Sequence, residues 1–150
     1  MPSHTEQQLS PYSPEQIFDL VMDIERYPQF LPWCRAARIT EQGEGYLLAE
    51  LIISFKHFSE SYVSRVSFTR PTAPAQTGHV LVEMVRGPFE HLTNRWEFTP
   101  TADGGTQIAF FIDFRFRSRL LEKLIGGLFS KATDKMALAF KERADALYSK

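Results

Sequence analysis

The sequence contains a single cysteine, Cys34, so it can form neither an intramolecular disulfide nor a cysteine cluster for zinc. A reducing compartment is therefore the natural location. The first ten residues carry no basic, apolar-cored signal and no arginine-rich transit peptide. No apolar run approaches the roughly 20 residues that a membrane span needs. We expect a cytoplasmic protein, at most peripheral to the inner membrane.

Motifs for catalysis and metal binding are also missing. The four histidines never occur at metal-ligand spacing, and there is no glycine-rich phosphate loop or nucleophile elbow. Cys34 is more typical of a small packed thiol than of a nucleophile. Among the strand glutamates, only Glu60 shares the apolar side of its strand, and even there a solvated strand end is the expected position. We therefore predict no catalytic residue, no metal and no cofactor.

Charge is nearly balanced, but it is unevenly distributed. The net charge is −1, whereas residues 112–150 hold nine basic and five acidic side chains. A basic C-terminal segment could meet anionic lipid or RNA, although a solvated helix face is the simpler interpretation. The candidate contact residues are Arg115, Arg117, Arg119 and Lys123. Nothing in the sequence indicates DNA binding.

Aromatic residues are abundant: thirteen Phe, five Tyr and two Trp. Residues 13–24 have the pattern of a helix start, with Ser13 as N-cap, Pro14 at the first helical position and Gln16 completing a capping box. A strand is predicted over residues 4–9, and a second short helix over 25–30. From Arg35 the apolar period changes to two, which predicts antiparallel strands up to residue 117 because the linkers are too short for crossover helices.

Residues 120–150 read as one long amphipathic helix with the pair Gly126 and Gly127 in its middle. Each helical glycine costs roughly 1 kcal/mol relative to alanine. We expect the pair either to let a ligand or strand approach the helix backbone, or to mark a break between two shorter helices.

The predicted fold is α+β and of the helix-grip type, with one domain over residues 1–150. A curved antiparallel sheet of about six to seven strands wraps a long C-terminal helix, and two short helices follow the first strand. Such a fold tends to enclose an elongated apolar pocket. Core packing alone could account for each apolar candidate; taken together they predict a lining that suits a flat ring with an apolar tail. The candidates are Phe30, Leu31, Trp33, Phe55, Tyr62, Val82, Met84, Phe89, Asn94, Trp96, Phe110, Ile112, Phe114, Leu121, Leu124, Ile125, Leu128 and Phe129.

Three blocks resemble the coenzyme Q-binding START-domain proteins of the polyketide cyclase-like superfamily. They are PYSPEQIFDLVMDIERYPQFLPWC at 11–34, GPFEHLTNRWEF at 87–98, and FRFRSRLLEKLIGGLF at 114–129 with RADALY at 143–148. The resemblance covers nearly the whole chain. It implies a tunnel near Tyr27, Pro28 and Pro88, in addition to several candidates above, and it supplies no catalytic residue.

The resemblance implies a non-catalytic carrier that binds ubiquinone or a polyprenyl quinone intermediate and supports respiratory electron transfer and quinone biosynthesis. Tyr62, Asn94 and Trp96 are candidate hydrogen-bond donors to the quinone, and an anionic membrane surface is a candidate partner. Two alternatives stay open. The family includes a ribosome-associating toxin, so the chain could bind the large ribosomal subunit. Other branches are aromatic polyketide cyclases or dehydratases, which would need a cavity-facing acid or base such as Glu60.

Overall fold

The computed structural model describes residues 3–55, 58–71 and 76–149. The elements in chain order are β1 (Ser3–Ser10), α1 (Pro14–Met22), the 3-10 helix η1 (Ile24–Gln29), β2 (Cys34–Gly43), β3 (Tyr46–Phe55), β4 (Phe58–Thr69), β5 (Gly78–Arg86), β6 (Phe89–Pro100), β7 (Thr106–Phe116), α2 (Arg119–Asp134) and α3 (Met136–Tyr148). The predicted order of strand, two short helices, strands and C-terminal helical segment is confirmed.

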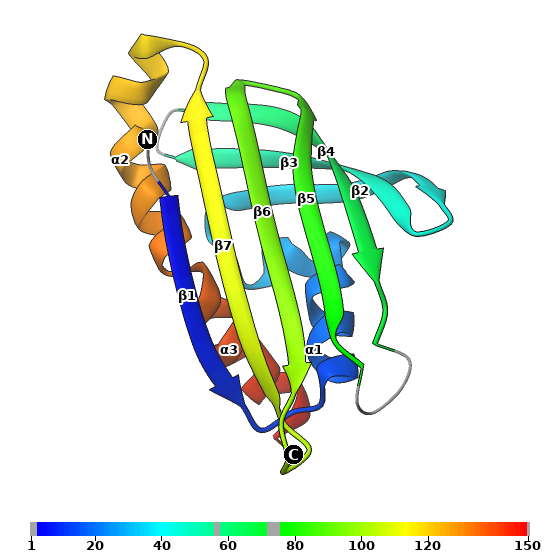
Figure 1. Ribbon diagram of the computed structural model, residues 1–150. Helices are drawn as coiled ribbons and strands as arrows, with labels where there is room; N and C mark the ends of the chain where they lie inside the picture. Colours follow the sequence, from blue (N-terminus) through cyan, green and yellow to red (C-terminus); the bar gives the residue numbers. More distant parts are fainter. Residues whose placement is uncertain (1–2, 56–57, 72–75, 150) are drawn as a thin grey trace.

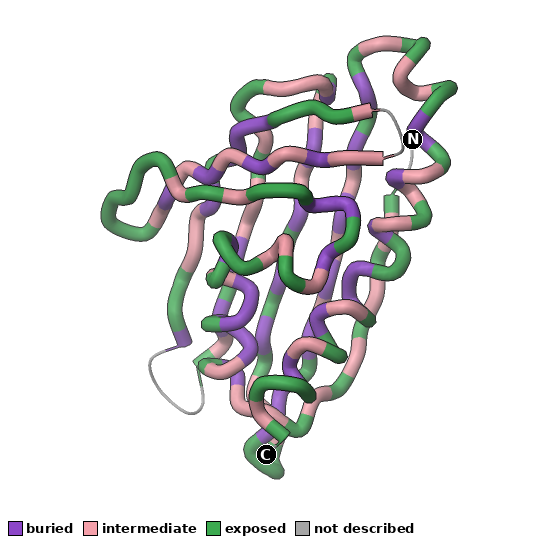
Figure 2. The backbone as a smooth tube through the Cα atoms, turned by 180° about the vertical axis from the view of Figure 1, so that it is seen from behind, coloured by how far each residue is buried: buried purple, intermediate pink, exposed green. Residues whose placement is uncertain are grey.

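The seven strands form one antiparallel sheet in the order β1-β7-β6-β5-β4-β3-β2. Figure 1 shows β1, β7, β6 and β5 side by side, with β2 and β3 crossing them at a steep angle, so the sheet is strongly twisted. All helices lie on one side of the sheet. Along β3 and β7, buried positions alternate with intermediate or exposed ones (Figure 2), as the period of two predicts. The helix-grip architecture is confirmed.

The start of α1 follows the predicted capping box. The Ser13 hydroxyl accepts a hydrogen bond from the Gln16 backbone N–H at 3.2 Å, and the Gln16 side chain accepts one from the Ser13 N–H at 3.0 Å. Ile17, Phe18 and Val21 are buried. These apolar residues fix α1 against the sheet, where it contacts β5 and β6.

The C-terminal segment is two helices rather than one long helix, and the break is at Lys135 instead of the glycine pair. The buried Thr133 hydroxyl donates to the Ser130 carbonyl at 2.9 Å, and the Lys135 N–H bonds the Ala132 carbonyl at 3.2 Å, three residues back. Both bonds tighten the last turn of α2. Gly126 and Gly127 lie within the continuous part of α2.

Candidate functional site

An internal cavity lies between the concave face of the sheet and the helices. The space open to the centres of water molecules is about 50 Å³. Its lining residues come from η1, the following loop, five strands and both C-terminal helices: Ile24, Tyr27, Trp33, Ala49, Leu51, Tyr62, Ser64, Val66, Val82, Leu92, Asn94, Trp96, Ile112, Phe129, Met136 and Phe140. We call this the inner cavity. At roughly 10–15 Å³ per water molecule it has room for a few waters, and it is much smaller than the predicted tunnel.

Seven predicted lining residues meet in the inner cavity: Trp33, Tyr62, Val82, Asn94, Trp96, Ile112 and Phe129. The sequence analysis did not single out Ser64, although it has the same strand parity as Tyr62 and Val66. Ala49 and Met136 were also not identified as lining residues. Pairing across β3, β4 and β5 places Ala49 opposite Ser64 and Val66 opposite Val82. The cavity is thus open where the facing side chains are small.

Polar groups in the inner cavity are few, and two of them are hydrogen-bonded to each other. The Trp96 indole N–H donates to the Asn94 side-chain oxygen at 3.0 Å, and the Asn94 amide donates to the Phe111 carbonyl at 2.9 Å. Trp96 has only one donor, so it is not available to a ligand, contrary to our expectation. Asn94 has a second amide N–H and keeps its place as a candidate donor.

Burial keeps the two tyrosine hydroxyls of the cavity neutral. Desolvation raises the pKa of Tyr62 and of Tyr27 well above the usual range, because the phenolate would lose its hydration. The Tyr27 hydroxyl donates to the Val21 carbonyl. No charged side chain is among the described residues that line the cavity. The cavity therefore favours a neutral ligand.

A second, outer groove lies beside the inner cavity. It has a volume of about 370 Å³ and is lined by Leu31, Pro32, Trp33, Ser54, Phe55, Leu128, Lys131, Ala132, Lys135, Met136 and Ala139. Trp33 and Met136 line both spaces, so they form the wall between them. The predicted lining residues Leu31, Phe55 and Leu128 belong to this outer groove.

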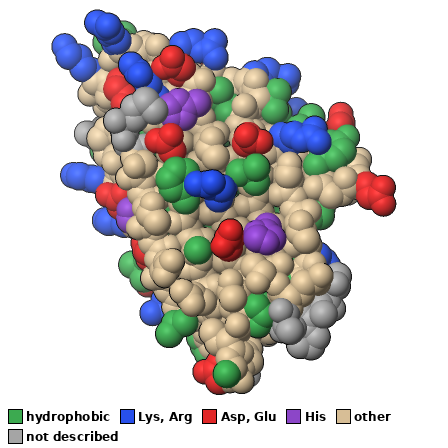
Figure 3. All heavy atoms as spheres, in the orientation of Figure 1, with side chains coloured by type: hydrophobic (Ala, Val, Ile, Leu, Met, Phe, Trp, Pro, Cys, Tyr) green, Lys and Arg blue, Asp and Glu red, His purple; other side chains and the backbone are tan. Residues whose placement is uncertain are grey.

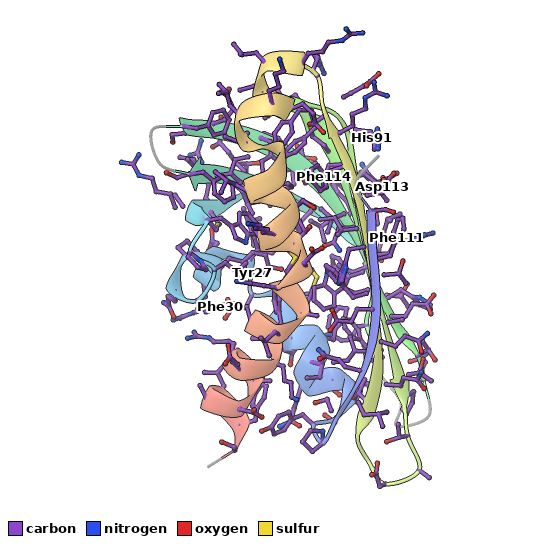
Figure 4. All side chains as sticks on the ribbon, turned by 90° about the vertical axis from the view of Figure 1, so that its left-hand side faces the viewer. Tyr27, Phe30, His91, Phe111, Asp113 and Phe114 are labelled. Atoms are coloured by element: carbon purple, nitrogen blue, oxygen red, sulfur yellow. The ribbon has the colours of Figure 1, made fainter. Side chains whose placement is uncertain are left out.

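Several predicted lining residues are packed in the solid core instead. Phe89, Phe110, Phe114 and Ile125 are buried but do not line the inner cavity. Phe114 lies between the sheet and α2 (Figure 4), with its ring centroid 4.7 Å from that of Phe129. Phenylalanine rings fill the end of the sheet that we expected to be tunnel, and this is why the cavity is short.

Other predicted lining residues are nearer the surface. Leu124 is 64% exposed, because α2 turns Ile125 and Phe129 inward and leaves Leu124 on its solvent face. Leu121 and Met84 are half-buried at the edge of the core. Phe30 packs against the rings of Tyr27 and Phe140, outside both spaces.

The glycine pair does not face the inner cavity. Among the described residues, a side chain at Gly127 would meet nothing within 4 Å, and the nearest neighbour of one at Gly126 would be the Glu122 carboxyl, at 3.3 Å. Gly127 is exposed on the solvent side of α2, so our expectation that it allows close approach of a ligand or strand is wrong. Gly126 is buried, and its position is nearest to the Glu122 carboxyl.

The predicted contact cations lie at one end of the molecule, where β7 passes into α2. Arg119 and Lys123 are exposed on the first turns of α2, next to Leu120, which is 64% exposed. Arg115 pairs with Glu90 at 3.2 Å, and Arg117 donates to the Phe89 carbonyl at 3.3 Å. Figure 3 shows Lys and Arg side chains gathered at this end. We call it the basic end.

The outer face of the sheet is occupied by paired groups rather than by a cluster. His91 lies 3.0 Å from Asp113, and Arg95 stacks on the Phe111 ring at 4.5 Å (Figure 4). Glu60, the candidate acid or base, is exposed at its strand end, as we expected. Among the described residues, no group of three His, Cys, Asp or Glu side chains could hold a metal ion. Within the same residues, no helix has the length and apolar character needed to cross a membrane.

Residues 10–141 match the family model "Polyketide cyclase / dehydrase and lipid transport". The chain belongs to this family. The predicted membership of the polyketide cyclase-like superfamily is thereby confirmed.

Relatives in the family carry two kinds of name. The chain is 48% identical to ribosome association toxin RatA of Rickettsia prowazekii, over 89% of this chain and 90% of that protein. It is 36% identical to RatA of Escherichia coli K12, over 99% of this chain and 90% of that protein. It is 28% identical to coenzyme Q-binding protein COQ10 homolog B of Xenopus laevis, over 98% of this chain and 59% of that protein.

Solved structures support the same fold. An 18 kDa protein from Caulobacter crescentus is 32% identical, with a TM-score of 0.71 and complete coverage of both chains. A START superfamily protein from Mycobacterium smegmatis has a TM-score of 0.74 at 18% identity, covering 97% of this chain and 98% of that one. The latter likeness concerns the fold alone.

Proposed function

We propose that the chain associates with bacterial ribosomes through its basic end, in the cytoplasm. The observation that carries the proposal is similarity along nearly the whole chain to proteins named for ribosome association. The basic end suits this role because exposed Arg119 and Lys123 can neutralise RNA phosphates. We further propose the large subunit as the partner, with subunit joining as the step that the protein blocks.

Sedimentation with purified ribosomal subunits tests this proposal. We expect binding that falls steeply as salt rises, and a loss of about tenfold or more when Arg119→Glu and Lys123→Glu are combined. Lys141→Glu removes an exposed cation from α3, away from the basic end, and should leave binding nearly unchanged. Failure of the wild type to sediment with either subunit at low salt would refute ribosome association.

A second candidate function is supported by the inner cavity. We propose that it takes the ring of a neutral apolar ligand, with a polyprenyl quinone as the chemical class, and that the outer groove takes the tail. A relative named for coenzyme Q binding supports this class. Each buried methylene of a tail contributes about 0.8 kcal/mol, so an apolar groove is a sufficient docking surface for it.

Fluorescence quenching tests the second function. Trp33 and Trp96 both line the inner cavity, so a bound quinone should quench their emission. We expect saturable quenching by decylubiquinone. Quenching that only grows linearly with concentration would mean collisional contact and would refute a quinone site.

We also propose that the carrier collects its ligand at an anionic bilayer. Leu120 and Leu124 are each 64% exposed on α2, beside Arg119 and Lys123. Exposed leucines next to cations suit a lipid surface, which rewards both apolar burial and positive charge. RNA offers no comparable apolar environment.

Paired variants separate the bilayer from the ribosome. Leu120→Ser with Leu124→Ser should weaken flotation with phosphatidylglycerol vesicles and leave ribosome sedimentation unchanged. The combined Arg119→Glu and Lys123→Glu variant should weaken both vesicle flotation and ribosome sedimentation. Equal flotation of wild type and leucine variants would contradict the membrane contact.

The chain acts by binding rather than by catalysis in this proposal. A cyclase or dehydratase would need an acid or base in its cavity, and the described lining residues include no carboxylate and no histidine. Turnover of an aromatic polyketide that vanished in Glu60→Gln would contradict the proposal.

A further inference from the structure

Ser64 is an unusual residue for the interior of a sheet. It is 1% exposed, and its hydroxyl has no hydrogen-bond partner among the described residues. Buried hydroxyls are normally hydrogen-bonded, because leaving one unpaired costs folding free energy. Ser64 is one of the residues that line the inner cavity, and its hydroxyl oxygen is almost completely covered, so the unpaired group lies in the wall of the space where a ligand would sit.

The surroundings of Ser64 define which group could pair with it. Ala49 is its partner on β3, and Met84 is its partner on β5. Tyr62, two residues earlier on the same face of β4, supplies a second neutral hydroxyl to the cavity. An ionised group would lose its hydration here without gaining a counter-charge, since none of the lining residues in the described part of the chain is charged. The complementary group is therefore a neutral carbonyl or hydroxyl.

We propose that Ser64 is the polar anchor of the inner cavity, where its hydroxyl hydrogen-bonds a carbonyl or hydroxyl on the ring of an otherwise apolar ligand. This inference rests on the second proposed function. About 50 Å³ of space for water centres holds only a few water molecules, so the ring enters only where lining side chains move apart, and no long chain fits. The rest of the ligand passes the wall formed by Trp33 and Met136 into the outer groove. Ser64 thus selects the oxygen-bearing ring, and the groove accepts any apolar tail.

The variant Ser64→Ala tests the anchor with two ligands of matched tail. Decylubiquinone carries ring oxygens, and decylbenzene does not. Binding of the first is measured by tryptophan quenching, and that of the second by competition. We expect Ser64→Ala to bind decylubiquinone about tenfold more weakly, the equivalent of one hydrogen bond, and to bind decylbenzene like the wild type. Ser61→Ala, at an exposed position of the same strand, is the control and should leave the binding of both ligands unchanged.

The ligand-free variant provides an independent readout. If the hydroxyl is unpaired in the free protein, Ser64→Ala should melt at or above the wild-type temperature. A lower melting temperature would mean that the hydroxyl is already satisfied in the free protein, and would overturn the anchor. The anchor would also be overturned if Ser64→Ala bound both ligands equally more weakly, or bound both like the wild type. No saturable binding of decylubiquinone to the wild type would instead refute the second proposed function itself.

Discussion

Two regions of the same concave sheet face differ in how they are filled. At the end near α2, the Phe89 and Phe116 rings stack at 4.7 Å, and both contact Phe129. In the middle, Ala49, Ser64 and Asn94 leave an internal space. Both regions come from strands in which buried residues alternate with less buried ones. Alternation therefore tells which face is inside, and side-chain size decides where a cavity remains.

The largest effect should come from opening the packed end. Phe114 is 1% exposed and contacts the rings of Phe89, Phe116 and Phe129. We expect Phe114→Ala to lower the free energy of unfolding by about 3–5 kcal/mol, measured by urea denaturation. The control is Phe111→Ala, on the outer face of β7, which should cost far less. Similar losses for both would contradict the view that this end is close-packed.

A smaller contrast comes from adding volume to each region. Ala49→Leu points into the inner cavity, so it should change the free energy of unfolding by less than about 1 kcal/mol while blocking ligand binding. Ala137→Leu adds the same atoms at a buried α3 position outside the cavity and should cost about 1–3 kcal/mol. A larger loss of unfolding free energy in Ala49→Leu than in Ala137→Leu would contradict this contrast.

A third region, the start of β2, contains the buried thiol of Cys34. The thiol is 2% exposed, and burial raises the pKa of Cys34 to about 12. Because the unfolded thiol releases its proton first, at about pH 9, stability should be complete below that pH and fall as pH rises toward 12. Between pH 8 and 10, wild type should lose more stability than Cys34→Ala in urea denaturation. The same dependence of unfolding free energy on pH in both proteins would contradict a buried Cys34 thiol.

The smallest effect is expected at the glycine pair. Gly127→Ala meets no neighbour, so it should raise the free energy of unfolding by up to about 1 kcal/mol. Gly126→Ala should gain less, because its methyl would press on the Glu122 carboxyl, which accepts from the Phe116 N–H at 3.3 Å. Thermal melting of both variants would show the difference, and a destabilised Gly127→Ala would contradict the open position.

The sequence predicted the order of elements because local signals determine it. The Ser13 capping box located α1, and strict alternation located β3 and β7. The break at Lys135 was missed because it depends on a side-chain bond from Thr133 that carries no periodic signal. The cavity itself was predicted, but its length was not. Whether a buried Phe lines a space or fills it depends on residues distant in sequence, as the contact of Phe114 with Phe129 illustrates.

Whether the inner cavity is a ligand site is tested most directly by extracting the purified protein with organic solvent and identifying what it held by mass spectrometry. We expect about one equivalent of a neutral, oxygen-bearing apolar compound in the wild type and a clear loss of it in folded Ala49→Leu. An empty wild-type protein, or the same amount of compound in both, would contradict the cavity's role and leave ribosome association as the function to pursue.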